Sequence, residues 1–144
     1  HFPTISQTEF SNNFELKHVV SWAGTYEIKN LKIALGSKWY SGRPETTPSS
    51  LEINKSNPSN LTIDYNSPNN KNLEDFFQVN FSTTYKWESS NKTQYKLGLS
   101  VINVFNKKNE ISEYYRINPT TNSIEDVKTY SLERTPNVSF RVQF

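Results

Sequence analysis

Hydrophobic and polar residues alternate with a period of two in five segments of the chain, which predicts five β-strands. The segments span residues 14–28, 31–41, 76–87, 94–105 and 136–144. In each of them one face is apolar and aromatic, and the other is mostly small, polar or charged. Because no helical apolar stripe of useful length occurs anywhere, we expect an all-β protein.

The connections between these segments alternate between short and long. Residues 29–30 and 88–92 form tight polar turns, whereas residues 42–75 and 106–135 form long polar stretches. Within the long stretches, 51–53 and 61–63 are candidate short strands, and 114–116 is expected to pair with 127–130 as a projecting hairpin. Tight periplasmic turns and long external loops are typical of transmembrane antiparallel β-barrels of the outer membrane.

Aromatic residues lie at both ends of the apolar face, with mainly aliphatic residues between them. One group is expected at the turn end (Tyr26, Tyr85, Trp87, Tyr95 and Phe144) and the other at the loop end (Trp39, Phe77 and Phe105). Two aromatic belts around an aliphatic band match a bilayer with two interfaces. The charged residues are expected on the opposite face (Lys17, Glu27, Lys32, Lys38, Lys86, Lys96 and Arg141). A Lys or Arg facing lipid at mid-bilayer would cost roughly 2–4 kcal/mol.

Composition changes this interpretation little. The mean hydropathy of −0.76 and a hydrophobic content of 33% resemble a soluble polar protein, but barrel strands need only every second residue to be apolar. A soluble β-sandwich or sugar-binding module also predicts alternation, although it does not predict the two belts or the loop asymmetry. The chain has no cysteine, which excludes disulfides and thiolate chemistry, and its net charge of +2 is too dispersed to indicate nucleic-acid binding.

Residues that would carry catalysis are not grouped in any known pattern. The two histidines, His1 and His18, stand in unrelated settings, and Glu74-Asp75 is expected to be a solvated acidic pair. No nucleophile elbow, phosphate-binding loop or metal-ligand spacing occurs. We therefore expect no enzyme activity, no catalytic residue, no metal site and no cofactor.

Four stretches of the sequence carry a family resemblance. They are Leu16–Val19 leading into Ser21–Tyr26, Tyr40–Pro44 followed by Thr46–Pro48, Leu99–Asn109, and Tyr130–Phe144. Together they resemble the C-terminal barrel strands of TonB-dependent outer-membrane transporters over essentially the whole chain, 1–144. The resemblance implies the final five strands of a plugged barrel of about 22 strands, with residues 42–75 and 106–135 as extracellular loops.

The resemblance also implies a function. Such transporters import scarce or large nutrients (iron chelates, cobalamin, glycans or peptides), and this chain would supply barrel wall and external loops. Arg43, Tyr114, Tyr115 and Arg116 are the candidate ligand contacts, and the alternative is that they only hold the loops together. The alternating end of the chain matches the signal read by the outer-membrane assembly machinery (Val138, Phe140, Val142 and Phe144). The C-terminus would then be periplasmic.

Five strands cannot close a barrel, because each open edge would leave backbone groups unpaired in lipid. We therefore expect the remaining strands and the plug to come from the same receptor, either as a cleaved piece or as a separate chain. The chain has no methionine, so we expect it to have been cut from a longer polypeptide or to have lost a leader. TonB (through the plug), the lipid bilayer and a surface lipoprotein are the other implied partners. A wall subunit or surface adhesin without transport remains the alternative.

Overall fold

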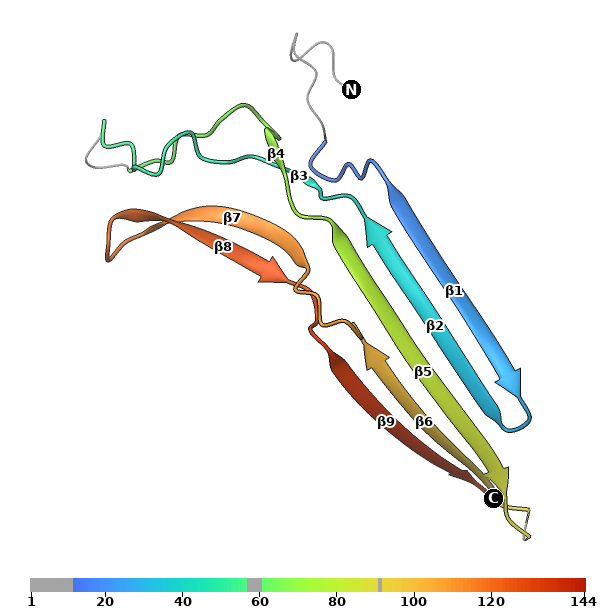
Figure 1. The fold of residues 1–144 in the computed structure, drawn as a ribbon. Helices are drawn as coiled ribbons and strands as arrows, with labels where there is room; N and C mark the ends of the chain where they lie inside the picture. Colours follow the sequence, from blue (N-terminus) through green and yellow to red (C-terminus); the bar gives the residue numbers. More distant parts are fainter. Residues whose placement is uncertain (1–11, 57–60, 91) are drawn as a thin grey trace. The chain divides into compact units, whose positions relative to one another are not determined.

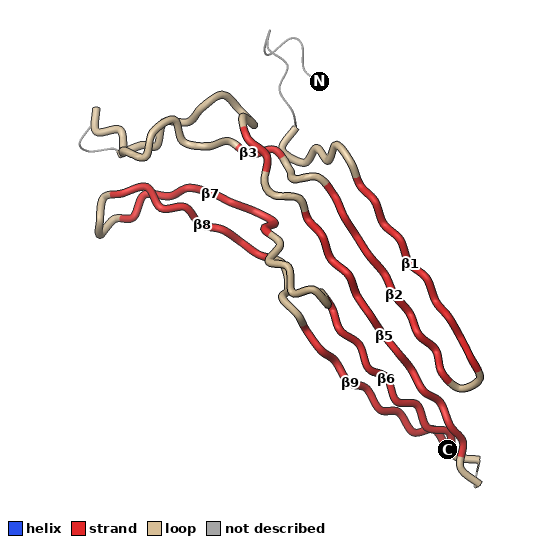
Figure 2. The backbone as a smooth tube through the Cα atoms, in the orientation of Figure 1, coloured by secondary structure: helices blue, strands red, loops and turns tan. Residues whose placement is uncertain are grey.

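Every regular element in the computed structural model is a β-strand, over the described residues 12–56, 61–90 and 92–144 (Figure 1; Figure 2). The strands are β1 (Val19–Ile28), β2 (Leu31–Tyr40), β3 (Pro44–Glu45), β4 (Lys71–Asn72), β5 (Phe76–Glu88), β6 (Gln94–Ile102), β7 (Glu110–Asn118), β8 (Ser123–Tyr130) and β9 (Thr135–Gln143). Across those described ranges, no helix is long and apolar enough to cross a membrane. The predicted all-β class is confirmed.

The chain divides into two compact units. The sheet unit comprises residues 18–40, 75–109 and 131–144. The loop unit comprises residues 41–74 and 110–130 together with the described part of 1–17. The long polar stretches of the sequence therefore fold together with each other, and the strands of the large sheet form a separate body.

The sheet unit is one open antiparallel sheet with the strand order β1-β2-β5-β6-β9. Its register keeps apolar positions on one face: Val20 lies opposite Trp39, and Trp39 lies opposite Phe77. The same alignment continues across the last strands, where Leu97 lies opposite both Tyr85 and Phe140. A slip of one residue between two strands would move the whole apolar set of the slipped strand to the other face.

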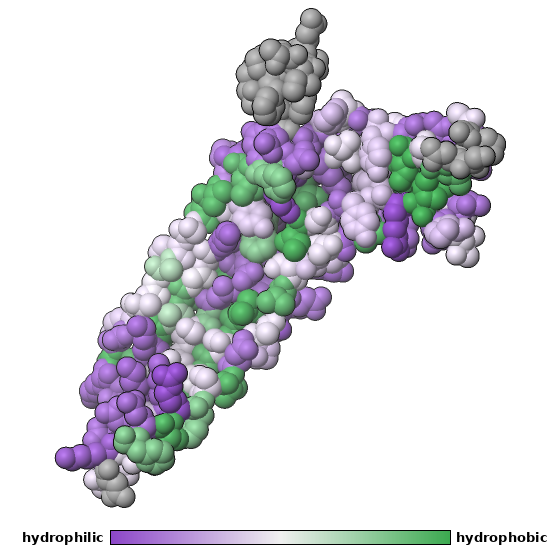
Figure 3. Space-filling view, turned by 180° about the vertical axis from the view of Figure 1, so that it is seen from behind, coloured by the Kyte–Doolittle hydropathy of each residue, from purple (hydrophilic) through white to green (hydrophobic). Residues whose placement is uncertain are grey.

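All charged residues of these five strands consequently share the second face. They are Glu27, Lys32, Lys38, Lys86, Glu88, Lys96 and Arg141. In the view from behind, hydrophilic residues gather at the turn end of the sheet (Figure 3). The predicted separation of charged and apolar positions is confirmed for these strands, whereas Lys17 precedes β1 and belongs to the loop unit.

The apolar face of the sheet is open rather than packed into a core. Trp22 is 56% exposed, Leu99 45% and Val138 73%. Among the described residues only two hydrophobic side chains are buried, Ile53 and Phe76. Soluble monomers rarely expose apolar patches of more than a few hundred Å². The sheet unit therefore lacks the second layer that would give a soluble sandwich its core.

The predicted first strand began too early. Residues 14–28 were expected to be one strand, but β1 begins at Val19. The Oδ1 atom of Asn12 accepts a hydrogen bond of 3.0 Å from the Phe14 amide, and the Asn12 carbonyl accepts one of 2.9 Å from the Glu15 amide. These bonds form a turn of the kind that asparagine favours, and the turn includes the first residues of the predicted strand.

The predicted fourth strand ended too late, because β6 stops at Ile102 and not at Phe105. Asn103 and Asn106 have φ angles of 53° and 55°, in the left-handed region where a strand cannot continue. In the first long stretch, 51–53 and 61–63 form no strands within the described part of the chain. Isolated bridges join Asn54 to Thr62 and Pro48 to Tyr65 instead.

The hairpin expected in the second long stretch is confirmed. It consists of β7 and β8, with Tyr114 opposite Val127 and Tyr115 opposite Asp126. Its pairing extends well beyond the predicted residues, over 110–118 and 123–130.

Candidate functional site

The aromatic residues expected at the membrane interfaces form clusters at both ends of the sheet. At the turn end, Trp87 stacks between Tyr85 at 5.8 Å and Tyr95 at 5.3 Å between ring centroids. At the other end, Phe77 stacks on Phe105 at 6.1 Å and lies opposite Trp39. Tyr26 lies opposite Ile33, near the turn between β1 and β2, and is exposed.

The residues expected to form the assembly signal lie along the edge strand β9. Val138, Phe140 and Val142 lie on the apolar face, opposite Leu99, Leu97 and Tyr95 respectively. Phe140 lies 6.2 Å from the rings of both Trp87 and Tyr95. Phe144 follows the strand and is fully exposed.

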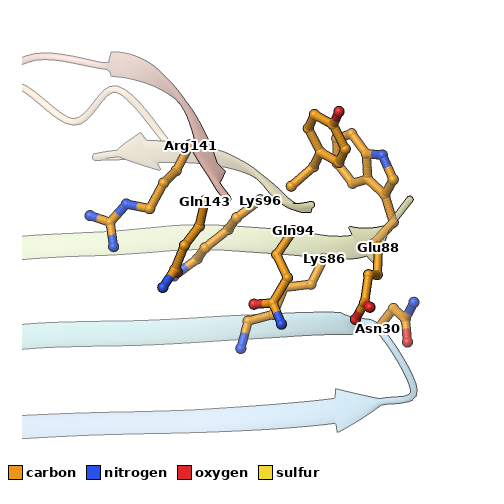
Figure 4. A pocket seen from close by; sticks show the side chains of 9 residues that line it. Asn30, Lys86, Glu88, Gln94, Lys96, Arg141 and Gln143 are labelled. Carbon is orange, nitrogen blue, oxygen red and sulfur yellow. The ribbon is translucent and has the colours of Figure 1, made fainter. Parts of the chain in front are cut away.

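A cavity of about 420 Å³ lies on the polar face at the turn end, and Figure 4 shows its side chains. Lys96 lies directly opposite Lys86 on one side and Arg141 on the other. Like charges that face each other across strands repel. Gln94 and Gln143 add amide groups to this lining. Cationic side chains thus outnumber the one carboxylate of the lining, that of Glu88.

A second cavity, of about 380 Å³, lies within the loop unit. Three of the four predicted ligand-contact residues, Arg43, Tyr114 and Tyr115, line it. Arg116 does not; its Nε atom donates a hydrogen bond of 2.8 Å to Glu125 across the hairpin. The structure therefore brings Arg43 together with the adjacent Tyr114 and Tyr115, which lie in the other long stretch.

Arg43 reaches this cavity from a tightly constrained segment. A Cβ atom at the preceding Gly42 would lie 1.7 Å from the Leu73 carbonyl oxygen, so that position requires glycine. The Leu73 amide donates to the Arg43 carbonyl at 2.9 Å, beside the β3–β4 pairing. The Arg43 guanidinium donates to the carbonyl of Ile111 in β7. Arg43 thus joins the two long stretches as well as lining the cavity.

Two glutamates that the sequence analysis did not single out share this cavity. Both carboxyl oxygens of Glu45 are buried and accept no hydrogen bond. The Glu113 side chain is only 3% exposed; it accepts a hydrogen bond of 3.0 Å from the Tyr115 hydroxyl and lies 3.4 Å from Lys128 and 3.8 Å from Lys71. Neither residue stands in a recognisable motif, and they lie in different stretches, so no sequence signal pointed to them.

The two carboxyl groups share one proton. Burial, and then the neighbouring Glu113, raise the pKa of Glu45 to about 8. Burial alone would raise the pKa of Glu113, but hydrogen bonds from Glu45, Tyr115 and Asp126 lower it to about 2. Burial and then Glu113 also raise the pKa of Asp126. The proton on Glu45 makes its buried oxygens tolerable, because two adjacent buried carboxylates cannot both ionise cheaply.

This pair predicts a specific dependence of stability on pH. Because the pKa of Glu45 is about 8 in the folded state against an ordinary value of 4.5, its contribution is complete below pH 4.5 and is lost as the pH rises towards 8. The pKa of Glu113 is lowered to about 2, so its contribution is present above 4.5 and is lost as the pH falls. Glu45→Gln should therefore remove much of the loss of stability between pH 5 and 8.

Limited proteolysis of residues 41–74 at several pH values measures this effect. The control is Glu52→Gln, since Glu52 is exposed and lies outside the cavity. Equal pH dependence in the wild type and the Glu45→Gln variant would show that the two glutamates do not share a proton.

Comparison of the chain with protein-family models, with curated proteins and with solved structures finds no match. Among the described residues, no group of three or more His, Cys, Asp or Glu side chains is arranged to hold a metal ion. The functional interpretation therefore rests on the residues of this chain and on their geometry.

Proposed function

We propose that this chain supplies wall strands and external loops of an outer-membrane TonB-dependent transporter that imports a scarce or large nutrient. The observation that carries the proposal is the exposed, charge-free apolar face that continues across all five strands of the sheet unit. An apolar surface of this extent needs an apolar environment. A lipid bilayer provides one without requiring a second protein layer.

The lengths of the strands support their placement across a lipid bilayer. Four of the five strands have 9 or 10 residues and β5 has 13. About 9–11 residues of a tilted strand cross the hydrocarbon. The stacked aromatic residues at both strand ends suit the two interfaces. If the tight turns lie on the periplasmic side, β9 runs towards the periplasm. Residues 41–74 and 110–130 then lie outside the cell.

The open edges of the sheet indicate that further strands must pair with it in a membrane. Within the described part of the chain, β1 and β9 each pair on one side only. In lipid, each unpaired backbone group would cost several kcal/mol. The proposal therefore requires a completing partner that bears the other strands and a plug. A wall subunit of a surface complex without transport is the second candidate, because the same apolar face and open edges would serve it.

Site-directed labelling tests the topology, since the chain contains no cysteine. In whole cells, a membrane-impermeant maleimide should label Thr120→Cys, which lies in the turn between β7 and β8. It should label Ser90→Cys, in the turn between β5 and β6, only after the outer membrane is permeabilised. Equal labelling of both positions in intact cells, or recovery of the protein in the soluble fraction, would refute the proposed topology.

Mass spectrometry of the intact purified complex separates transport from a purely structural role. The transporter requires a plug-bearing polypeptide in the complex. A sealed barrel without such a segment would favour the wall-subunit alternative.

A further inference from the structure

The cavity of the loop unit is rimmed by exposed aromatic rings. Tyr65 and Tyr114 line it and are 49% and 50% exposed, and Phe14 also contributes to the lining. Their surroundings are rich in Asn, Ser and Thr, so these rings are not parts of a hydrophobic core. Aromatic rings with a polar edge suit a ligand that presents both C–H surface and hydrogen-bonding groups.

The polar lining consists largely of groups that can both donate and accept hydrogen bonds. The Nδ2 group of Asn69 donates to Asn13 Oδ1 at 2.9 Å, which fixes the two amides beside each other. The backbone amide of Asn69 donates to the Thr46 hydroxyl, also at 2.9 Å, and Asn69 is held at a φ of 57°. These amides and hydroxyls are therefore positioned before any ligand arrives, which reduces the entropy lost on binding.

The charges of the lining argue against an anionic ligand. Arg43 is the one cationic side chain that lines the cavity in the described part of the chain, and it already donates to the Ile111 carbonyl. Lys71 and Lys128 lie beside Glu113 and do not line the cavity. A chelate or phosphate carrying several negative charges would meet a single cation, Arg43, which already donates a hydrogen bond, and the two glutamates Glu45 and Glu113.

The polar side chains of the lining argue against a purely apolar ligand as well. The volume of about 380 Å³ lies in the range of small-ligand sites, which is about 300–1,000 Å³. Sites for apolar molecules are lined mainly by hydrophobic side chains. Here the apolar residues are few (Phe14, Pro44 and Leu73).

We propose that this cavity binds a neutral saccharide, with Tyr65 and Tyr114 against the C–H faces of its rings and Asn13 and Asn69 hydrogen-bonded to its hydroxyls. A sugar hydroxyl both donates and accepts, as the amides of the lining do. Binding of the saccharide does not depend on the proposed function. Its import does, because the saccharide would be the class of nutrient that the transporter takes up.

Binding is tested with the full protein purified in detergent. The probes are immobilised neutral oligosaccharides of glucose, galactose, mannose and xylose, with oligouronates and ferric citrate as anionic counterparts. The wild type should retain at least one neutral oligosaccharide, and Tyr114→Ala should weaken its affinity about tenfold. Tyr114→Phe should keep most of the affinity, because the ring face remains.

The matched control is Tyr130→Ala, which removes a tyrosine of the same hairpin that does not line the cavity. Its affinity should equal that of the wild type. Retention of only oligouronate or ferric citrate, retention of no probe, or equal losses in Tyr114→Ala and Tyr130→Ala would overturn the inference.

The labelling experiment in whole cells keeps the two proposals distinguishable. If the topology holds and no saccharide is retained, this inference fails and the transporter proposal stands. If a saccharide binds through Tyr114 while the protein is found in the soluble fraction, the site stands and the transporter proposal fails.

Discussion

Replacing Leu99 with arginine is expected to prevent the protein from accumulating in the outer membrane, whereas arginine at the adjacent Ser100 is expected to be tolerated. Leu99 lies in the middle of the apolar face, between Thr83 and Val138. An arginine facing lipid at this depth costs about 2–4 kcal/mol, which is a large part of the stability of a typical domain.

The same substitution would cost little stability in a soluble sheet. There a leucine that is already 45% exposed could be exchanged for arginine at a cost within about 0.5 kcal/mol. Ser100 is the matched control because it lies opposite Ser82 and Asn137 on the polar face. Immunoblots of membrane fractions measure both variants, and equal amounts of the two would exclude a lipid-facing role for the apolar face.

The large sheet could be predicted from the sequence because its strands alternate apolar and polar positions with few exceptions, such as Ser37 and Thr83 on the apolar face. A strand such as β5 encodes its two faces residue by residue, with Phe77, Val79 and Phe81 on one side and Gln78 and Asn80 on the other. Register then follows from matching apolar faces between neighbours.

Two strand ends, the start of β1 and the end of β6, could not be predicted in the same way. The alternation continues past Ile102 to Phe105, but the left-handed conformation of Asn103 ends the strand. Before β1, the Oδ1 atom of Asn12 accepts a hydrogen bond from the Phe14 amide, at the point where the predicted strand was expected to begin. Hydrophobic patterning records neither a left-handed backbone nor a local hydrogen bond between a side chain and the backbone.

The candidate site was predicted only in part. Arg43 and Tyr114 could be proposed because they are large side chains with binding chemistry in long polar stretches. The Glu45–Glu113 pair and the Asn13–Asn69 contact could not, because each joins residues far apart in chain segments that lack periodicity. Their meeting depends on how the loop unit folds, which a single sequence does not reveal.

Asn103 has the second largest expected effect, and it shows why asparagine stands at the rim of the sheet. Its side chain is fully buried. The Nδ2 group donates to the carbonyls of Lys107 at 2.8 Å and Leu132 at 3.0 Å, and Oδ1 accepts from the Lys107 amide at 3.1 Å. Asn103 therefore ties the segment that follows β6 to the one that precedes β9.

Asn103→Ala should lower the free energy of unfolding by about 2–3 kcal/mol, because it removes the side-chain partner of the Leu132 carbonyl and of the Lys107 amide. The Lys107 carbonyl still accepts a hydrogen bond of 3.3 Å from the Asn109 Nδ2 group. Asn106→Ala is the control, since its φ of 55° nearly equals the 53° of Asn103 and the backbone strain of the two variants cancels. Asn106 is exposed and its Oδ1 accepts a single bond from the Arg134 amide, so its loss should cost about 1 kcal/mol. Thermal unfolding of the purified protein in detergent measures the difference. Equal destabilisation by the two substitutions would mean that the left-handed backbone, and not the buried hydrogen bonds, requires asparagine at position 103.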